Sequence, residues 1–353
     1  MVIGGLIIVL LLVLVLPFVF HQVEENLEIF LFIMGIAAAV ISGAMNMELF
    51  LSALEHPIMI ASAVFIAGAL FFLLRDHFKR FMDIVFAKVP IPLVVFLVVV
   101  LLGLLSSVIT AIIASIILVE IIFALPVERK HKIVIVVLAC FSIGLGAALT
   151  PIGEPLATIA IAKLNVDFFY LLRLLGKFII PAVVVFGFLA AGYAAWAVKK
   201  QQSEKQLSAV DHGDISGEPE EEMEKDTWKS ITFRAVKIYL FVMALTFLGE
   251  GFKPLIDKYV LGLDYRILYW INTVSAVLDN ATLTAAEISP QMDVMQIEAI
   301  LMGLIIAGGM LIPGNIPNII SASKLRISST EWAKIGVPFG ALTMLIFYVI
   351  LFV

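Results

Sequence analysis

The feature that most constrains the fold is a series of long stretches without a single charged residue. They cover residues 2–20, 29–47, 57–74, 89–119, 133–153, 178–198, 299–323 and 335–353. Most reach the roughly 20 residues that a helix needs to cross the hydrocarbon of a bilayer. With 62% hydrophobic and 14% charged residues and a mean hydropathy of +1.11, the chain lies outside the range of soluble domains. The sequence therefore predicts an all-α polytopic membrane protein.

The first stretch is expected to stay in the protein as a transmembrane helix, because it lacks the basic start and cleavage site of a secretory signal. We expect a multi-pass protein of the cell membrane. Cys140, the single cysteine, excludes a disulfide framework or a thiolate metal cluster within one chain. The net charge of −5 comes largely from the segment 203–226, and no basic patch elsewhere indicates nucleic acid binding.

The chain divides into two hydrophobic halves that resemble one another. A Gly-, Ser- and Glu-rich segment at 199–230 lacks apolar periodicity and is interpreted as a linker. At an offset of 161, TPIGEPLATIAIAKL (150–164) aligns without gaps with LIPGNIPNIISASKL (311–325). At an offset of 169, SSVITAIIAS (106–115) aligns with SAVLDNATLT (275–284). Two matches in the same order predict an internal repeat.

Lysines and arginines set the expected orientation, because they are enriched in cytoplasmic loops. Those within 75–88 and 129–132 put both ends of the block 89–125 on the cytoplasmic side. We expect a re-entrant hairpin with its tip at SSVIT (106–110), since two full spans would need a polar turn there. The same rule makes the linker cytoplasmic and the block 265–289 a hairpin that enters from outside. The two repeats are therefore expected to be inverted.

The expected organisation has four parts. They are N-terminal transmembrane helices at 1–55, a first repeat at 56–198 with a hairpin (89–125) and a broken helix (133–164), the linker at 199–230, and a second repeat at 231–353 with a hairpin (265–289) and a broken helix (295–325). The runs GLGAALTPIGEP and AGGMLIPGNIPN predict the breaks, because proline removes a backbone donor and clashes with the preceding turn. Kinked helices are the alternative. Unwound backbone in a bilayer is tolerated where it lines a polar cavity, and it suits ion binding.

Two acidic residues fall inside these blocks. Asp279 lies in the second hairpin, and Glu154 lies between the two prolines of the first broken helix. A charge at bilayer depth costs at least about 2.5 kcal/mol and marks a functional or paired group. A structural ion pair or a helix N-cap is the alternative for Asp279, and an N-cap is the alternative for Glu154. A proton and a cation compete for one carboxylate, and such competition combined with alternating access suffices for antiport.

The candidate ion site joins these acids to polar and glycine residues of the hairpins and breaks. Its members are Asp279, Asn280, Ser275 and Thr282 in the second hairpin, Ser106, Ser107 and Thr110 in the first, and Thr150, Gly153, Glu154, Gly314, Asn315 and Asn318 in the breaks. Their oxygen ligands suit a hard cation. We expect transported Na⁺ and H⁺, with Asp279 and Glu154 as Na⁺ ligands, and no cofactor.

Other charged residues are left outside the candidate site. Glu120, Glu250, Glu287 and Glu298 lie near expected span ends, where interfacial carboxylates are common. Lys163 and Lys324 occupy equivalent positions of the two broken helices, and snorkelling to the interface is their expected role. Neutralisation of an empty site is the alternative for these lysines.

The segment SAVLDNATLTAA, followed by a Gly/Pro-broken span, and the turn TPIGEP resemble motifs of the ion transporter superfamily. The resemblance is to NhaD-type sodium/proton antiporters, arsenite permease-like proteins and a small prokaryotic family of cation-transporter-like proteins. It implies an elevator-type architecture, in which hairpins and broken helices move against a scaffold, usually in a homodimer. Thr110 and Ala111 depart from the Asp-Asn pair of such hairpins, and Asn315 stands where the first repeat has Glu154. The stoichiometry therefore stays open.

The sequence favours a secondary active transporter, a cation/proton antiporter, over an enzyme. A Na⁺-coupled symporter of a small anion such as a dicarboxylate is the first alternative, although neither hairpin core has an arginine to bind an anion. An arsenite-type exporter is the second. A membrane-embedded aspartyl protease needs two aspartates, and Asp279 is the only aspartate among the deep acids.

Overall fold

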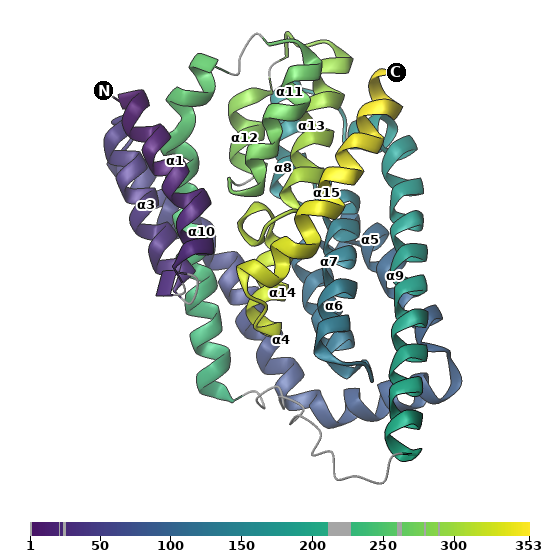
Figure 1. Ribbon diagram of the computed structural model, residues 1–353. Coiled ribbons are helices and arrows are strands. Elements are labelled where there is room, and N and C mark those ends of the chain that lie inside the picture. Colours follow the sequence, from purple (N-terminus) through teal and green to yellow (C-terminus); the bar gives the residue numbers. More distant parts are fainter. Residues whose placement is uncertain are drawn as a thin grey trace.

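The computed structural model describes residues 2–20, 22–23, 26–210, 227–259, 263–278, 280–288 and 290–353. Within these ranges the chain folds into helices and contains no strand (Figure 1). The first half contains α1 (Val2–Val19), α3 (Leu27–Ser42), α4 (Met47–Lys88), α5 (Ile91–Ile109), α6 (Ala111–Ala124), α7 (Arg129–Ala147), α8 (Pro155–Leu164) and α9 (Tyr170–Val210). The second half contains α10 (Trp228–Tyr259), α11 (Tyr265–Ile271), the 3₁₀ helix η1 (Asn272–Ala276), α12 (Asn280–Glu287), α13 (Val294–Gly308), the 3₁₀ helix η2 (Ile312–Gly314), α14 (Ile316–Leu325) and α15 (Ser329–Phe352).

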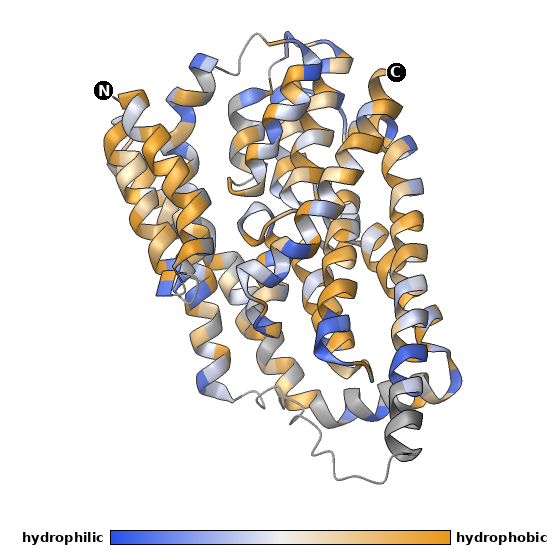
Figure 2. Ribbon diagram, in the orientation of Figure 1, coloured by the Kyte–Doolittle hydropathy of each residue, from blue (hydrophilic) through white to orange (hydrophobic). Residues whose placement is uncertain are grey.

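Several of these helices are suited to a bilayer. Five are long and apolar enough to cross one, over Ile91–Ile109, Arg129–Ala147, Tyr170–Ser203, Trp228–Leu255 and Ser329–Phe352. Figure 2 shows hydrophobic residues along most of their length, with hydrophilic residues near the two ends of the molecule and at its centre. The prediction of an all-α membrane protein is confirmed.

Two expected boundaries differ from the helices that form. The boundary at residue 55 falls inside α4, which runs without interruption to Lys88 and ends along the lower edge of the molecule in Figure 1. The expected linker begins at 199, but α9 continues to Val210. The extension KKQQSEKQLSAV is rich in Lys, Gln, Glu, Ala and Leu, which have high helix propensity even though they lack an apolar face. The remaining linker residues 211–226 lie outside the described ranges.

The two hairpin blocks occupy opposite halves of the molecule. In the first, the chain passes from α5 to α6 at Thr110, whose φ of 76° and ψ of 149° reverse its direction. In the second, η1 is followed by α12, and Asp279 between them lies outside the described residues. In Figure 1, α6 runs to the lower end of the molecule, whereas α11 and α12 lie in its upper half.

The two broken helices have the same geometry at equivalent positions. Adding 161 to the last residue of α7 and to both ends of α8 gives the last residue of α13 and both ends of α14. The residue before each second segment is extended, with φ/ψ of −155°/159° at Glu154 and −153°/145° at Asn315. The residue after it is left-handed, with 51°/48° at Asn165 and 51°/44° at Arg326. The offset seen in the sequence therefore also relates the local backbone.

Small residues bring α3 and α10 into close contact at one side of the molecule, beside α1 (Figure 1). A Cβ atom added at Gly35 would lie 2.8 Å from the carbonyl oxygen of Ala244, and one added at Gly251 would lie 2.7 Å from Ala38. Glycine allows such approach of helix backbones in membranes, where dispersion contacts drive helix association.

This packing predicts opposite effects of one substitution at two helical glycines. Gly251→Ala forces α3 and α10 apart, and overpacking costs about 1–3 kcal/mol. Gly192→Ala on α9 meets no atom within 4 Å and gains helix propensity of about 1 kcal/mol. We expect the thermal midpoint of the detergent-solubilised protein to fall for Gly251→Ala and to stay or rise for Gly192→Ala. Equal midpoints for the two variants would contradict the close α3–α10 contact.

Candidate functional site

Each hairpin turn contacts the break of the broken helix that follows it. At the first, the backbone N–H of Ala111 donates to the carbonyl of Gly153 at 2.8 Å. At the second, a Cβ added at Gly314 would lie 2.7 Å from the carbonyl oxygen of Ser275. Both hairpins therefore reach the level at which the broken helices are unwound.

Two equivalent serines bind the hairpins to the broken helices. The hydroxyl of Ser106 is shared between the carbonyl of Gly103 on its own helix at 2.6 Å and that of Ile143 on α7 at 3.0 Å. That of Ser275 donates to the carbonyl of Leu304 on α13 at 2.8 Å. Both serines are fully buried. The two carbonyls are related by the offset of 161, and the two serines by the offset of 169. These hydroxyls bind the backbone of each hairpin to that of a broken helix. Their role is therefore to position the candidate site.

The matched glycines of the breaks are needed for close approach. A Cβ at Gly153 would overlap the carbonyl of Ala147, the last residue of α7. A Cβ at Gly314 would lie 2.5 Å from the carbonyl oxygen of Gly308, the last residue of α13. Each unwound segment thus folds back onto the end of the helix it leaves, which explains the Gly-Gly match at this position of the repeat.

The second break also packs against the first broken helix. The side-chain amide of Asn315, which is 6% exposed, lies over Gly144 of α7, where an added Cβ would be 2.5 Å from its nitrogen. Asn318 closes the second break itself, because its amide donates to the carbonyls of Gly308 and Leu311, both at 2.8 Å. One side chain therefore satisfies two carbonyls that leave the helical ladder.

Asn280, the first residue of α12, brings an unsatisfied amide to this centre. It is 4% exposed, and neither its oxygen nor its nitrogen has a hydrogen-bond partner among the described residues. A Cβ at Gly308 would lie 2.6 Å from its Nδ2 and 2.8 Å from its Oδ1. A buried amide without partners costs about 1–3 kcal/mol, and such groups call for an explanation such as a ligand.

Glu154 lies at the start of α8 and is 7% exposed. It occupies the N-cap position, but its side chain accepts no capping hydrogen bond. The alternative role of Glu154, capping α8 through its carboxylate, is therefore not observed. α8 packs beside α12, and both run to the upper half of the molecule in Figure 1. The helices that begin with Glu154 and Asn280 are thus neighbours.

The remaining candidate residues have more local roles or lie outside the described part of the chain. Thr150 donates to the carbonyl of Ser107, and Ser107 donates to that of Leu104. Thr110 caps α6 by accepting from the N–H of Ile113 at 3.4 Å. Asp279 and the side chain of Thr282 are outside the described residues.

The sequence missed the partners of two equivalent lysines. Lys324, near the end of α14, forms an ion pair with Glu120 of α6. Lys163, near the end of α8, donates to the carbonyl of Ile288 just after α12 at 3.3 Å. In place of snorkelling alone, each lysine ties a second half-helix to the hairpin of the other half. Both contacts join residues that are far apart in the sequence. A single sequence does not show which distant residues are in contact.

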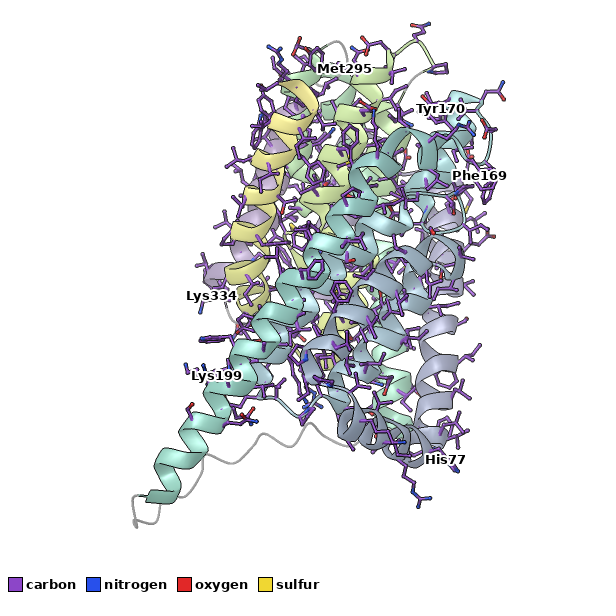
Figure 3. The ribbon with its side chains drawn as sticks, turned by 90° about the vertical axis from the view of Figure 1, so that its right-hand side faces the viewer. His77, Phe169, Tyr170, Lys199, Met295 and Lys334 are labelled. Atoms are coloured by element: carbon purple, nitrogen blue, oxygen red, sulfur yellow. The ribbon has the colours of Figure 1, made fainter. Side chains whose placement is uncertain are left out.

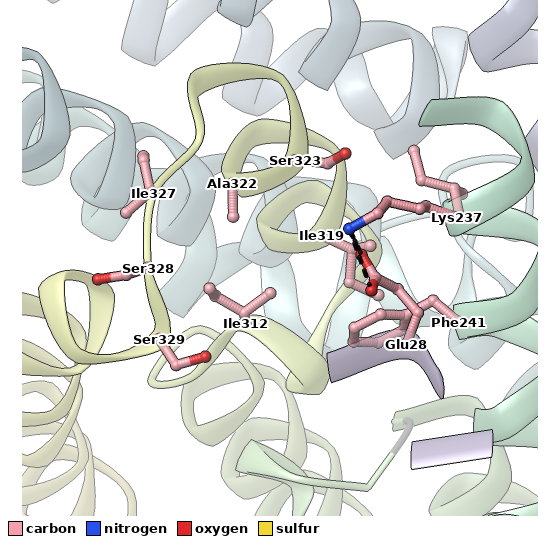
Figure 4. A pocket seen from close by; sticks show the side chains of 11 residues that line it. Glu28, Lys237, Phe241, Ile312, Ile319, Ala322, Ser323, Ile327, Ser328 and Ser329 are labelled. Atoms are coloured by element: carbon pink, nitrogen blue, oxygen red, sulfur yellow. Dashed lines mark hydrogen bonds and ion pairs between the residues drawn. The ribbon is translucent and has the colours of Figure 1, made fainter. Parts of the chain in front are cut away.

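A pocket opens between the group α3 and α10 and the end of α14 (Figure 4). Its volume is about 100 Å³, and Lys237 of α10 pairs with Glu28 of α3 at 3.2 Å on its wall. A smaller cavity of about 20 Å³ lies toward α1 and includes Val277 at the second hairpin turn. Ile312 and Ser329 line both cavities, so a seam of loose packing leads from the pocket to that turn.

Among the described residues, no group of three or more His, Cys, Asp and Glu side chains is arranged to hold a metal ion. No curated protein sequence matches the chain. A family model described as "Protein of unknown function (DUF1646)" matches residues 3–353. Since the match covers nearly the whole chain, the protein belongs to this DUF1646 family.

Proposed function

We propose that the protein is a secondary active transporter that exchanges Na⁺ for H⁺ by alternating access. The observation that carries this proposal is the meeting of two unwound breaks with two hairpin turns around Glu154 and Asn280, both more than nine-tenths buried. Unwound backbone and half-helix ends at mid-depth are how transporters bind ions. A buried acid and an unsatisfied amide at the starts of two neighbouring helices offer the oxygen ligands that a hard cation prefers.

Exchange follows from competition for the same carboxylates. Glu154 and Asp279, the sequence neighbour of Asn280, release a proton when they bind a cation and release the cation when they are protonated. Asn280 and Asn315 add neutral amide oxygens, so that the bound state is close to neutral overall. Only the loaded or the protonated site then moves, because an empty carboxylate is costly to bury.

Packing across the two halves supports two inverted repeats that move against a scaffold. α6 of the first half packs on α14 of the second, and α12 of the second packs on α8 of the first. This reciprocal exchange is what a pseudo-two-fold axis in the membrane plane generates. The seam of cavities beside α1, α3 and α10 supports these helices as part of the scaffold of an elevator-type transporter, which by resemblance is a homodimer.

Basic residues support an orientation in the cell membrane. Lys88, Arg129, Lys130 and Lys132 adjoin the ends of α4 and α7, and Lys199 lies on the lower part of α9, the same end as His77 (Figure 3). Cytoplasmic loops are enriched in Lys and Arg. This end is therefore cytoplasmic in our proposal, and the expected linker between α9 and α10 is assigned to the same side.

One observation favours a second candidate, a Na⁺-coupled symporter of a small anion. Neither Glu154 nor Asn315 caps its helix with its side chain, so α8 and α14 begin at the breaks without a side-chain cap. Helix N-termini favour anions. An arsenite-type exporter would use the same feature. The Glu154 carboxylate supplies negative charge at one of these ends, which is why we place exchange first.

The exchange proposal predicts a cation-dependent proton flux. Purified protein is reconstituted into liposomes with an acidic interior and a trapped pH-sensitive dye, and Na⁺, Li⁺, K⁺ or succinate is added outside. We expect Na⁺ alone to dissipate the gradient, and Glu154→Gln or Asp279→Asn to slow this at least about tenfold, equal to about 1.4 kcal/mol.

The matched control is Glu250→Gln, since Glu250 is 42% exposed and pairs with Lys253 on α10. It should exchange at the wild-type rate. A pH gradient that persists after Na⁺ is added would contradict the antiporter. Na⁺-dependent uptake of succinate would establish the symporter in its place.

The contact of Gly308 with Asn280 predicts a specific loss of affinity. Gly308→Ala puts a methyl group within 3 Å of the Asn280 amide and displaces the second hairpin turn. Overpacking of about 1–3 kcal/mol should raise the Na⁺ concentration for half-maximal exchange, whereas Gly192→Ala should leave it unchanged. Equal half-maximal Na⁺ concentrations in the two variants would contradict the assignment of Asn280 to the ion site.

The proposed orientation predicts the side from which single cysteines react. Cys140 is fully buried, so the native chain is a silent background for a membrane-impermeant maleimide. Lys199→Cys should react only from the cytoplasmic side and Met295→Cys, at the opposite end in Figure 3, only from outside. Labelling of both from one side would overturn the topology.

A further inference from the structure

A buried polar column runs along one face of α12. Asn280, Thr284 and Glu287 are spaced by four and three residues, which puts their side chains on the same side of a helix. They are 4%, 0% and 1% exposed. The Thr284 hydroxyl donates to the Asn280 carbonyl at 2.8 Å. The column therefore leads from the hairpin turn to the last residue of the helix, where the sequence suggested an interfacial carboxylate.

Glu287 ends this column next to Asn272 of η1. The Asn272 amide lies beside the Glu287 carboxyl, and Asn272 is fully buried. Both carboxyl oxygens and both amide atoms lack a hydrogen-bond partner of good geometry. Within the part of the chain that the structure describes, two buried polar side chains without such a partner therefore lie next to each other at the end of α12.

The wall behind Asn272 is rigid and tightly packed. A Cβ at Gly303 of α13 would lie 2.7 Å from the Tyr269 carbonyl oxygen and 3.2 Å from the Asn272 Cβ. Tyr269 is itself fixed, since its hydroxyl donates to the Met344 carbonyl at 2.9 Å. Asn272 therefore has little freedom to turn toward other partners.

The charged groups near this end of α12 are engaged elsewhere. α12 packs against α8, α10 and α13. On these helices Lys163 donates to the Ile288 carbonyl at 3.3 Å, Lys253 pairs with Glu250 at 3.7 Å, and Glu298 pairs with Lys177 of α9 at 3.1 Å. Within the described ranges, the Glu287 carboxyl has no ion-pair partner.

Hydrogen-bond chemistry decides which ligand this pair takes. A protonated carboxyl donates its O–H to the Asn272 oxygen and accepts an N–H from the same amide, which satisfies all four atoms together. A carboxylate accepts only, so the amide oxygen stays without a donor. The last turn of a helix also disfavours negative charge. The pair supplies three side-chain oxygen atoms, whereas Ca²⁺ takes six to eight oxygen ligands.

We propose that Glu287 and Asn272 form a proton-binding site, separate from the candidate ion site at the hairpin turn. The Glu287 carboxyl holds the proton, and Asn272 is its hydrogen-bond partner. The column through Thr284 joins this site to Asn280. Its use in proton exchange rests on the proposed function, whereas the binding of the proton does not.

Infrared spectroscopy of the full-length protein at neutral pH tests the binding directly. The wild type should show the carbonyl absorption of a protonated carboxyl, shifted in deuterium oxide, and Glu287→Gln should remove it. Asn272→Leu should keep the absorption and move it to higher frequency, because the carbonyl loses its donor. Glu250→Gln should leave it unchanged. A spectrum in which Glu287→Gln removes only carboxylate absorption overturns the proposal.

Proton flux in liposomes separates this proposal from the proposed function. In an exchanging protein, Glu287→Gln should slow Na⁺-driven proton flux about tenfold at low driving force while Glu250→Gln does not, and full flux in Glu287→Gln overturns the role of the column. If no cation drives flux through the wild type, the antiporter fails, and the infrared absorption still decides the proton site.

Discussion

The rest of this structure depends on satisfying backbone groups that prolines release inside an apolar protein. A helix interrupted in lipid leaves N–H and C=O groups without water, and each unsatisfied group costs several kcal/mol. The protein answers with its own polar groups: Asn318 donates to two carbonyls of the second break, and the first break accepts the N–H of Ala111. The partner of the first break thus comes from a hairpin turn, and that of the second break comes from the half-helix that follows it.

The packing of the half-helices that follow the breaks brings the two halves to one centre. Each second half-helix packs against the hairpin of the other half, with α6 on α14 and α12 on α8, and the pair between Lys324 and Glu120 ties one such contact. The Asn315 amide of the second break also lies over Gly144 of α7. Each break finds hydrogen-bond partners within its own half, whereas the half-helix after it packs on the hairpin of the other half, so a chain cut at the linker should lose these contacts between the halves.

The sequence predicted the helices and their breaks, which depend on local residues. It did not predict which side chains are buried by tertiary packing. Hydropathy predicted the helical membrane protein, and the prolines together with the offset of 161 marked the residues where α8 and α14 begin and end. The extension of α9 to Val210 was not predicted, because its residues favour a helix but show no apolar periodicity. Glu287 was not included in the candidate site because a carboxylate near the end of an expected span is commonly interfacial. The packing of α8, α10 and α13 against α12 buries it instead. Asp279, the main candidate from the sequence, lies outside the described residues. Its role in ion binding stays a prediction.

The positions of two buried carboxyls at opposite helix ends suggest how one protein handles two ions. Glu154 precedes the first turn of α8, where exposed N–H groups and the helix dipole favour the ionised form, and an ionised carboxylate is what a metal cation needs. Glu287 follows the last turn of α12, where the dipole has the opposite sign and an amide completes the neutral acid. In our proposal the cation and the proton therefore meet different electrostatic surroundings, the cation at the start of α8 and the proton at the end of α12, on two helices that pack against each other.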